Sequence, residues 1–270
     1  MSGTDPFDLE GRRVLVTGAG GLLGAEFASA LAERGAEVHL ADLSAMALAA
    51  TVERLAGEGA DAKAHAVDIT DAAAVAHLVD DVGDLDALVN SAAIDARFQG
   101  LDGGGHLEGY PAEAFRLSLE VNLTGTFLVT QACCRTMARR GPRGRGSIVN
   151  VSSIYGLVGP DQRLYEAPDD QTPARFKPVD YATTKAGVIG FTRAVAALYR
   201  GTDIRVNALT PGGTFNGQDD AFVTAYADRT LLGRMAEPGD YRGPIVFLCS
   251  DASAYMTGAN LVVDGGWTAV

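Results

Sequence analysis

The sequence predicts one α/β domain over residues 1–270, in which a doubly wound parallel sheet of about seven strands has helices on both faces. Two observations lead to this prediction. Short runs of β-branched and apolar residues alternate along the chain with longer stretches of helical periodicity. The chain is also 47% hydrophobic over 270 residues, which is enough for one large core, and no repeat, linker or low-complexity segment divides it.

The first strand, turn and helix set the pattern for the rest of the chain. Residues 12–17 (RRVLVT) form an apolar run that ends in the glycine cluster GAGGLLG, and Leu22, Leu23, Phe27 and Leu31 then follow at helical spacing. A helix between successive strands implies that the strands are parallel. The expected strands are 12–17, 37–41, 62–67, 87–90, 147–152, 204–209 and 260–264, and the further expected helices are 44–57, 72–82, 111–120, 121–140, 179–199 and 238–250.

The glycine-rich turn after the first strand suits a dinucleotide. Gly18, Gly21 and Gly24 allow a tight turn, a close approach to a pyrophosphate and close packing of the helix on the strand, while the helix N-terminus attracts the phosphate charge. Asp42 follows the second strand, where its carboxylate can accept hydrogen bonds from the adenosine ribose and repel a 2′-phosphate. The sequence therefore predicts NAD in preference to NADP. An alternative role for Asp42 is a helix N-cap shared with Ser44.

Three more polar residues follow predicted strands. Asp68, Asn90 and Ser153 come at or just after the ends of strands 62–67, 87–90 and 147–152. Ligands of doubly wound sheets bind beyond the carboxyl ends of the strands, so we expect these side chains to meet the glycine turn at one edge of the sheet. The glycines at 103–105 predict a mobile loop at the same edge.

Tyr181 and Lys185 lie four residues apart on the predicted helix 179–199 and therefore share one helix face. An ammonium close to a phenol favours the phenolate, so we expect Lys185 to lower the pKa of Tyr181 from about 10 toward the range of a useful general acid and base. Taken alone, the same spacing more often indicates a surface tyrosine packed on a lysine stem.

Two irregular segments are expected to border this cleft. Residues 157–178 contain several prolines and no regular pattern, and they predict a substrate loop in which Arg163, Tyr165, Arg175 or Lys177 meets a polar or anionic group. The alternative is a solvated surface loop. Residues 211–230 begin with Pro211, Gly212 and Gly213 and are expected to close over the cofactor and substrate.

Charge and composition exclude several classes of protein. The net charge of −12 and the pI near 4.7 disfavour nucleic acid and anionic membranes as partners. The three cysteines have no metal-ligand spacing, and no two of the four histidines lie in an H-x-x-x-H pair, so no metal site is expected. The polar start of the chain has no signal-peptide pattern, and no apolar run is long enough to cross a bilayer. We therefore expect a cytoplasmic protein.

Taken together, the motifs from residue 12 to residue 266 resemble the short-chain dehydrogenase/reductase family of single-domain, Rossmann-type enzymes. The resemblance implies a catalytic tetrad of Asn122, Ser153, Tyr181 and Lys185. It further implies a cofactor site made by Gly18, Gly21, Leu22, Leu23, Gly24, Asp42, Leu43, Asp68, Ile69, Asn90, Ala92, Tyr181, Lys185, Pro211, Gly212, Gly213 and Thr214. The motif Val263-Asp264-Gly265-Gly266 resembles the C-terminal signature of family tetramers, so the resemblance implies a homotetramer or homodimer.

The reaction that the resemblance implies is hydride transfer between NAD(H) and a secondary alcohol or ketone. Tyr181 would exchange the hydroxyl proton, Lys185 would lower the pKa of Tyr181 and hold the nicotinamide ribose, Ser153 would hydrogen bond the reacting oxygen, and Asn122 would position a water in a proton relay. The alternatives are a 3-oxoacyl or small-ketone reductase on the same fold, and a non-catalytic NAD-binding sensor or scaffold.

Two segments resemble a narrower subgroup that is linked with flagellin modification and sialic-acid-like surface sugars. These segments are 153–163 (SIYGLVGPDQR) and 211–218 (PGGTFNGQ). The resemblance implies a polar small-molecule substrate, a sugar or sugar derivative, and the candidate substrate residues are Tyr155, Arg163, Tyr165 and Asn216.

Overall fold

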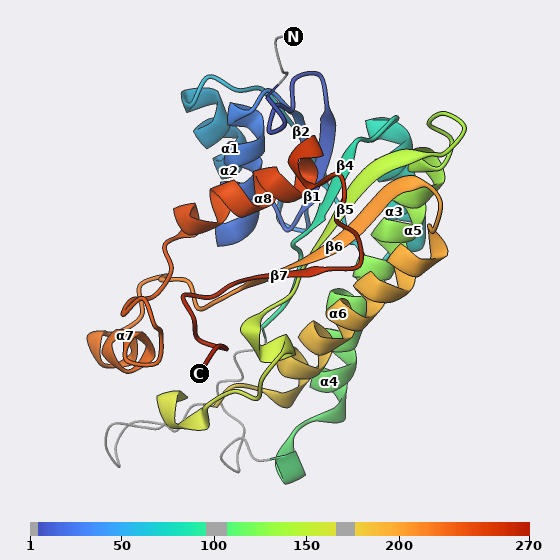
Figure 1. Ribbon diagram of the computed structural model, residues 1–270. Helices are drawn as coiled ribbons and strands as arrows, with labels where there is room; N and C mark the ends of the chain where they lie inside the picture. The colour runs from blue at the N-terminus through green and yellow to red at the C-terminus, as the bar shows by residue number, and fades with distance from the viewer. Residues whose placement is uncertain (1–4, 96–106, 166–175) are drawn as a thin grey trace.

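A computed structural model describes residues 5–95, 107–165 and 176–270, and in it seven parallel strands form one sheet in the order β3-β2-β1-β4-β5-β6-β7 (Figure 1). The order reverses direction between β1 and β4, which is the doubly wound arrangement that the sequence predicts. The strands are β1 (Arg13–Thr17), β2 (Glu37–Asp42), β3 (Ala62–Ala66), β4 (Ala87–Asn90), β5 (Arg145–Val151), β6 (Asp203–Pro211) and β7 (Asn260–Val263).

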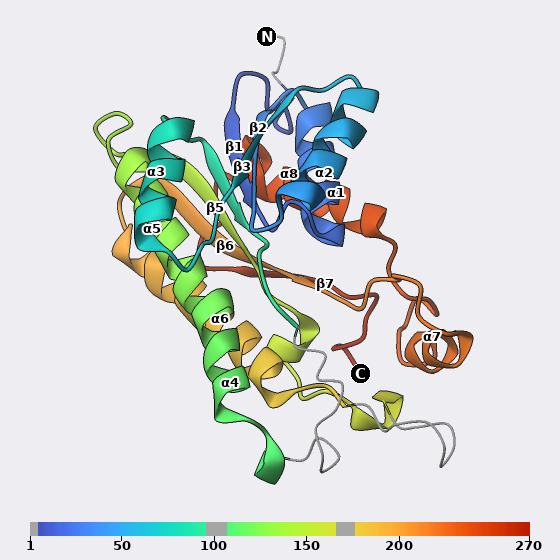
Figure 2. The same ribbon diagram turned by 180° about the vertical axis from the view of Figure 1, so that it is seen from behind.

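Helices cover both faces of this sheet (Figures 1 and 2). One face packs against α1, α2 and α8 through a core that includes Phe27, Leu48 and Ile245, and the other face packs against α3, α5 and α6 through Leu78 and Met137. The predicted fold class is therefore confirmed. The helices are α1 (Leu22–Glu33), α2 (Ala45–Gly57), α3 (Ala72–Val82), α4 (Ala112–Leu119), α5 (Thr126–Met137), α6 (Val179–Leu198), α7 (Asp220–Ala227) and α8 (Arg242–Cys249).

The carboxyl ends of the central strands lie level with one another. Thr17 of β1 pairs with Asn90 of β4, and Asn90 pairs in turn with Asn150 of β5. Beyond this edge lie α7 and the C-terminus of the chain, in the lower half of Figure 1, while the N-terminus lies at the top. The register therefore brings the segments that follow β1, β4, β5 and β6 to one side of the molecule.

Two helical features differ from the sequence prediction. The expected helix 121–140 begins with a π-helical turn, Glu120–Gly125, before it becomes α5. Helix α7 was not predicted, although Asp219 caps it by accepting a hydrogen bond from the backbone N–H of Phe222 (2.9 Å). An eight-residue helix gives only a weak periodic signal, because it contains about two turns.

Some expected loops fall partly or wholly beyond the described part of the chain. The glycines at 103–105 lie outside the described residues, and so do residues 166–175 of the predicted substrate loop. The described part of that loop contains one short 3-10 helix, Gln162–Tyr165, and another, Ile154–Gly156, lies just before the loop. Within the described ranges, no helix has the length and apolar character needed to cross a membrane.

Candidate active site

The glycine turn between β1 and α1 forms a close-packed cradle. Gly18 has a φ of +66°, and a Cβ atom there would lie 2.6 Å from the Cα of Ala92. A Cβ atom on Gly24 would overlap the carbonyl oxygen of Gly18. Helix α1 then begins after Gly21 without any side-chain cap, so its first N–H groups remain available to an anion. The cradle thus fits the pyrophosphate of a dinucleotide.

Gly24→Ala should lower the free energy of unfolding by about 1–3 kcal/mol, because the new methyl group meets rigid backbone rather than a movable side chain. The measurement is urea unfolding, together with titration of NADH fluorescence. Gly57→Ala is the matched control, since a Cβ at the end of α2 meets no atom within 4 Å. Equal stability of the two variants would contradict the tight packing of Gly24 on Gly18.

The carboxylate of Asp42 lies against the same turn. Its Oδ2 accepts a hydrogen bond from the N–H of Gly20 (3.0 Å), and its Oδ1 accepts one from the N–H of Ser44 (2.9 Å). The cap of α2 is Ser44 itself, which accepts a hydrogen bond from Ala47. Asp42 therefore helps to fix both loops, and each of its oxygens retains capacity for a further donor such as a ribose hydroxyl.

Thr17 and Asn90 join the strand ends rather than face the rim. Thr17 Oγ1 accepts hydrogen bonds from the N–H groups of Ser91 (3.2 Å) and Ala92 (3.3 Å). The side chain of Asn90 is buried, and its Nδ2 donates to Asn150 Oδ1 (2.8 Å) and to Thr130 Oγ1 (2.9 Å). The expectation that the Asn90 side chain meets the other rim groups is therefore wrong, because that side chain ties β4 to β5 and α5 inside the core.

Asp68 and Ile69 follow β3 with opposite exposure. Asp68 is exposed, and its Oδ1 accepts hydrogen bonds from both the N–H (2.8 Å) and the hydroxyl (2.7 Å) of Thr70, which lower the pKa of Asp68. Ile69 is buried in the core beneath α3 and α5. The exposed carboxylate is thus the polar group that this strand end offers at the rim.

Tyr181 and Lys185 lie in the first two turns of α6 and face the carboxyl end of β5. Lys185 is buried, and its Nζ donates a hydrogen bond to the carbonyl oxygen of Val151 (2.8 Å) while lying 5.7 Å from the ring centroid of Tyr181. Tyr181 is half-buried and is hydrogen bonded to Ser153. The surface-pair interpretation is therefore wrong, since the two side chains point inward.

Burial changes the acidity of both groups. Burial raises the pKa of Tyr181, the carboxylate of Asp95 raises it further, and the hydrogen bond with Ser153 opposes both effects. Burial also lowers the pKa of Lys185 to about 8. The net direction for the pKa of Tyr181 is therefore upward, because desolvation dominates and the Lys185 ammonium is directed at Val151, and a lowering of that pKa by Lys185 stays a prediction.

Ser153 is positioned by close contact between the end of β5 and α6. Ser152 donates a hydrogen bond to the carbonyl oxygen of Lys185 (2.8 Å), and a Cβ atom on Gly156 would lie 2.7 Å from that same oxygen. Ser153 Oγ accepts a hydrogen bond from the N–H of Tyr155 (3.2 Å), which begins the next turn. Ser153 and Tyr181 are 28 positions apart in the sequence, and the fold brings their side chains together.

Asn122 lies in the π-helical turn and links two parts of the site. Its Oδ1 accepts from the N–H of Ile94 (2.8 Å), and its Nδ2 donates to the carbonyl oxygen of Ile94 (3.0 Å) and to Thr184 Oγ1 (3.1 Å). Both Nδ2 hydrogens are used in this way. The side chain thus positions the loop after β4 against α6, and its role in a proton relay stays a prediction.

The segment after β6 approaches the C-terminal part of the chain. The N–H of Gly212 donates to the carbonyl oxygen of Val263 (2.9 Å) in the backbone, and the N–H of Gly213 donates to the hydroxyl of Tyr226 (2.5 Å). The carbonyl oxygen of Gly212 accepts from the hydroxyl of Tyr241 (3.1 Å). Residues 211–214 are therefore held in place by β7, α7 and the turn before α8.

An aromatic cluster borders the predicted catalytic residues. It consists of Tyr155, Tyr165, Phe222, Tyr226 and Trp267. The hydroxyl groups of Tyr155 and Tyr165 lie 3.0 Å apart, and the rings of Tyr226 and Trp267 stack with centroids 4.2 Å apart. Because Tyr181 packs against the same cluster, aromatic surface forms one side of the expected substrate site.

The other two predicted substrate residues are less closely tied to this surface. Arg163 is exposed and pairs with Asp161, both by Nε to Oδ1 (2.9 Å) and by a second guanidinium nitrogen to Oδ2 (2.8 Å). Asn216 is exposed in the turn before α7. Among the described residues, no contact joins either side chain to Tyr181.

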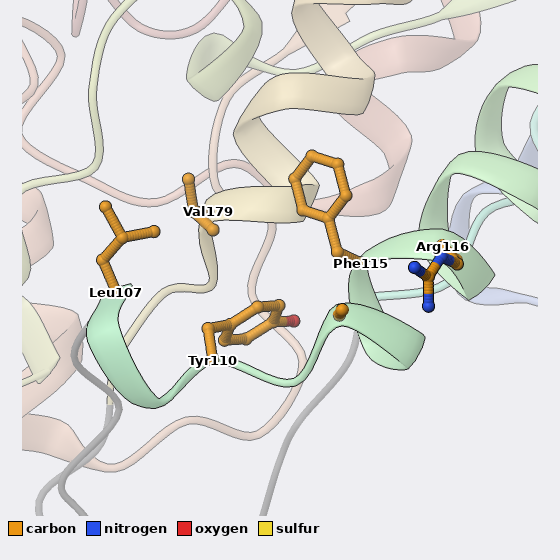
Figure 3. A pocket seen from close by; sticks show the side chains of 6 residues that line it. Leu107, Tyr110, Phe115, Arg116 and Val179 are labelled. Atoms are coloured by element: carbon orange, nitrogen blue, oxygen red, sulfur yellow. The ribbon is translucent and has the colours of Figure 1, made fainter.

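A separate cleft of about 320 Å³ lies beside α4 and the start of α6 (Figure 3). The residues that line it include Leu107, Tyr110, Phe115, Val179 and the exposed Arg116. None of the four predicted catalytic residues lines this cleft, so it is distinct from the candidate active site.

Sequence reasoning missed several residues that build the site. Ser152, Gly156 and Thr184 position the predicted catalytic groups, and Tyr226 and Trp267 reach the candidate site from distant parts of the chain. Only Gly156 carried a usable signal, since a glycine just after a strand end often marks close backbone approach.

Comparison with known proteins identifies the family. Residues 12–167 match the family described as short chain dehydrogenase, and residues 173–268 match the family described as enoyl-(acyl carrier protein) reductase. The chain belongs to the short-chain dehydrogenase/reductase family. It is accordingly an oxidoreductase with a nicotinamide cofactor that acts on alcohol groups or the corresponding carbonyl groups.

Three similar proteins cover almost the whole chain. The 2-keto-3-deoxy-L-fuconate dehydrogenase of Xanthomonas campestris pv. campestris is 33% identical, over 96% of this chain and 81% of that protein. The D-threitol dehydrogenase of Mycolicibacterium smegmatis is 35% identical, over 97% and 95%. The crystal structure of a gluconate 5-dehydrogenase from Burkholderia cenocepacia in complex with NADP and tartrate superimposes with a TM-score of 0.83 at 32% identity, over 98% of each chain.

Proposed function

We propose that this protein is a dehydrogenase that interconverts a secondary alcohol and a ketone on a sugar or sugar derivative. The observation that carries the proposal is the position of Tyr181, hydrogen bonded to Ser153 and one helical turn from Lys185, at the carboxyl ends of the strands. The similar proteins named above act on 2-keto-3-deoxy-L-fuconate, D-threitol and gluconate, which supports a hydroxylated substrate.

Each residue of the proposed site has a separate role in the reaction. A bound nicotinamide cofactor supplies or accepts the hydride. Tyr181 Oη moves the proton of the substrate hydroxyl, and the hydroxyl of Ser153 holds the same oxygen by a hydrogen bond. Lys185, once near the cofactor ribose, holds that ribose and favours the ionised form of Tyr181. The glycine cradle and the N-terminus of α1 hold the pyrophosphate.

The test is formation of NADH or NADPH at alkaline pH across sugars, sugar acids, sugar phosphates, nucleotide sugars, polyols and simple secondary alcohols. Parallel reactions contain the Tyr181→Phe protein. Turnover of a sugar class that disappears in the variant would support the proposal. If no compound turns over while NADH still binds tightly, the proposal fails for these substrate classes, and a substrate of another class or a non-catalytic sensor becomes the better description.

We also propose that NAD is preferred over NADP. Asp42 lies against the glycine turn, where its carboxylate would repel a 2′-phosphate and accept hydrogen bonds from ribose hydroxyls. The related gluconate 5-dehydrogenase structure holds NADP and so gives no support to this preference, which needs direct measurement.

Asp42→Ala should shift the preference toward NADP by about 10-fold or more, because it removes one charge repulsion and one or two charge-assisted hydrogen bonds. The measurement is the ratio of the Kd values for NADH and NADPH by fluorescence titration. Asp71→Ala is a suitable control, since the Asp71 carboxylate also accepts backbone hydrogen bonds but lies at the start of α3. An unchanged ratio would remove Asp42 from the cofactor site.

Three further expectations stay predictions. They are assembly as a homotetramer or homodimer, a cytoplasmic location, and membership of the subgroup linked with flagellin modification and sialic-acid-like sugars. The similar proteins reported above give no support to that narrower subgroup.

A further inference from the structure

Lys177 places an ammonium directly over the ring of the proposed acid and base. Its Nζ lies 4.1 Å from the ring centroid of Tyr181 and 5.8 Å from that of Tyr155. The side chain of Lys177 is only 13% exposed, which is unusual for a lysine. A cation in this position borders the space that a substrate of Tyr181 would enter.

The backbone of Lys177 is fixed in this position. Gln162 Nε2 donates a hydrogen bond to the carbonyl oxygen of Lys177 (3.0 Å), and the N–H of Lys177 donates to Gln162 Oε1 (3.0 Å). Pro178 follows at once and precedes the first residue of α6. The stem of the lysine therefore starts from a rigid point, so less conformational entropy remains to be lost when the ammonium binds a ligand.

The charge of Lys177 is balanced by a more exposed group. Asp95 Oδ2 forms an ion pair with Lys177 Nζ, and the side chain of Asp95 is 38% exposed. Over the described ranges, Asp95 is the only acceptor that is hydrogen bonded to this ammonium. An ammonium has three donor hydrogens, so it can bind a second acceptor without breaking the ion pair.

Other cations near the aromatic cluster are held elsewhere. Arg163 and Arg229 both pair with Asp161, and Arg229 also lies over the ring of Trp267. Lys177 is thus the cation that the described residues bring to Tyr181, apart from the catalytic Lys185. A protein with a net charge of −12 repels anions at long range, so an anionic substrate would need such a local positive group.

We propose that Lys177 binds a carboxylate of the substrate, and that the preferred substrates are hydroxy acids whose carboxylate lies within a few carbon atoms of the reacting alcohol. This inference rests on the proposed function, since it assumes that the substrate meets Tyr181. The carboxylate shares the ammonium with Asp95 or displaces it. A neutral polyol leaves the ion pair intact and gains nothing from the charge of Lys177.

The experiment compares aldonates with alditols of the same carbon skeleton, namely D-gluconate with D-glucitol, D-galactonate with galactitol and D-threonate with D-threitol. The quantity is the ratio of kcat/KM for the acid to kcat/KM for the alditol. We expect the native protein to favour at least one acid, and Lys177→Met to lower that ratio by about 10- to 100-fold, as for loss of a charge-assisted hydrogen bond.

Two other variants sharpen the result. Lys63→Met is the matched control, because Lys63 is also ion paired, with Glu37 (2.6 Å), but lies on β3, and it should leave the ratio unchanged. Asp95→Asn should raise the ratio, since the carboxylate of the substrate no longer competes with a resident one. A purely structural role of the ion pair predicts instead that Lys177→Met and Asp95→Asn act in the same direction.

The outcomes separate this inference from the proposed function. If the native protein oxidises alditols as well as acids, or if Lys177→Met leaves the ratio unchanged, the inference is wrong while the proposed function stands. If no pair is oxidised, the proposed function loses support, and calorimetric titration of the same acids and alditols into the NADH-bound protein decides the inference. Tighter binding of an acid than of its alditol, lost in Lys177→Met, supports it, and equal or absent binding of each pair overturns it.

Discussion

Tyr181→Phe should lower kcat by about 10²- to 10⁴-fold on whichever substrate the native protein uses, which is the usual contribution of a positioned general acid and base. The phenylalanine keeps the ring that packs against the aromatic cluster and lies below Lys177, so the fold and the cofactor cradle should remain. The measurement is steady-state turnover together with the Kd of NADH, and only turnover should change.

Tyr199→Phe is the matched control for this experiment. Tyr199 lies at the C-terminal end of α6, at the opposite end of that helix from Tyr181, and is hydrogen bonded to Cys134. The Tyr199→Phe protein should retain native turnover, although it too loses a tyrosine hydroxyl group and the hydrogen bond that this group makes. Turnover of the Tyr181→Phe protein within about ten-fold of native would remove Tyr181 from the role of acid and base.

The fold could be predicted from sequence because its signals are local and repeated. Each strand in the centre of the sheet is a short apolar run, and each following helix repeats its apolar residues at helical spacing, as in β1 and α1. The turn glycines were also recognisable, since their physical demands, a positive φ at Gly18 and close contact at Gly24, exclude most other residues. A parallel sheet then follows from these local signals, because strand–helix–strand units join parallel strands with a right-handed connection.

The site could be predicted only in part, because several of its properties depend on contacts between distant segments. Asn90 ends a strand like the other rim residues, yet its amide turns inward to Asn150 and Thr130. The pKa of Tyr181 depends on burial by the aromatic cluster, to which Trp267 contributes from the C-terminal end of the chain. The position of Lys177 over Tyr181 depends on Gln162, fifteen residues earlier. None of these contacts has a periodic signal in the sequence.

Lys185→Met should stabilise the fold at neutral pH, although it should also abolish activity. Burial lowers the pKa of Lys185 to about 8 from its ordinary 10.5, so the unfolded chain binds more protons than the folded chain between these two values. The native protein therefore gains stability as pH rises through that window. At pH 7 the charged, buried lysine costs about 3 kcal/mol relative to a neutral group, and near pH 10 it costs less than about 1 kcal/mol.

The experiment is urea unfolding of the native and Lys185→Met proteins at pH 7, 8.5 and 10. The free energy of unfolding of the variant, minus that of the native protein, should be about 2 kcal/mol more positive at pH 7 than at pH 10. Loss of the hydrogen bond to Val151 shifts the difference by a similar amount at each pH, so the slope remains diagnostic. If the difference in free energy of unfolding does not change with pH, the pKa of Lys185 is not lowered. In that case, the charged Lys185 beside Val151 does not destabilise the fold. In the expected case, the fold gives up stability at neutral pH to keep an ammonium next to Tyr181, which is reasonable only if that ammonium serves the reaction.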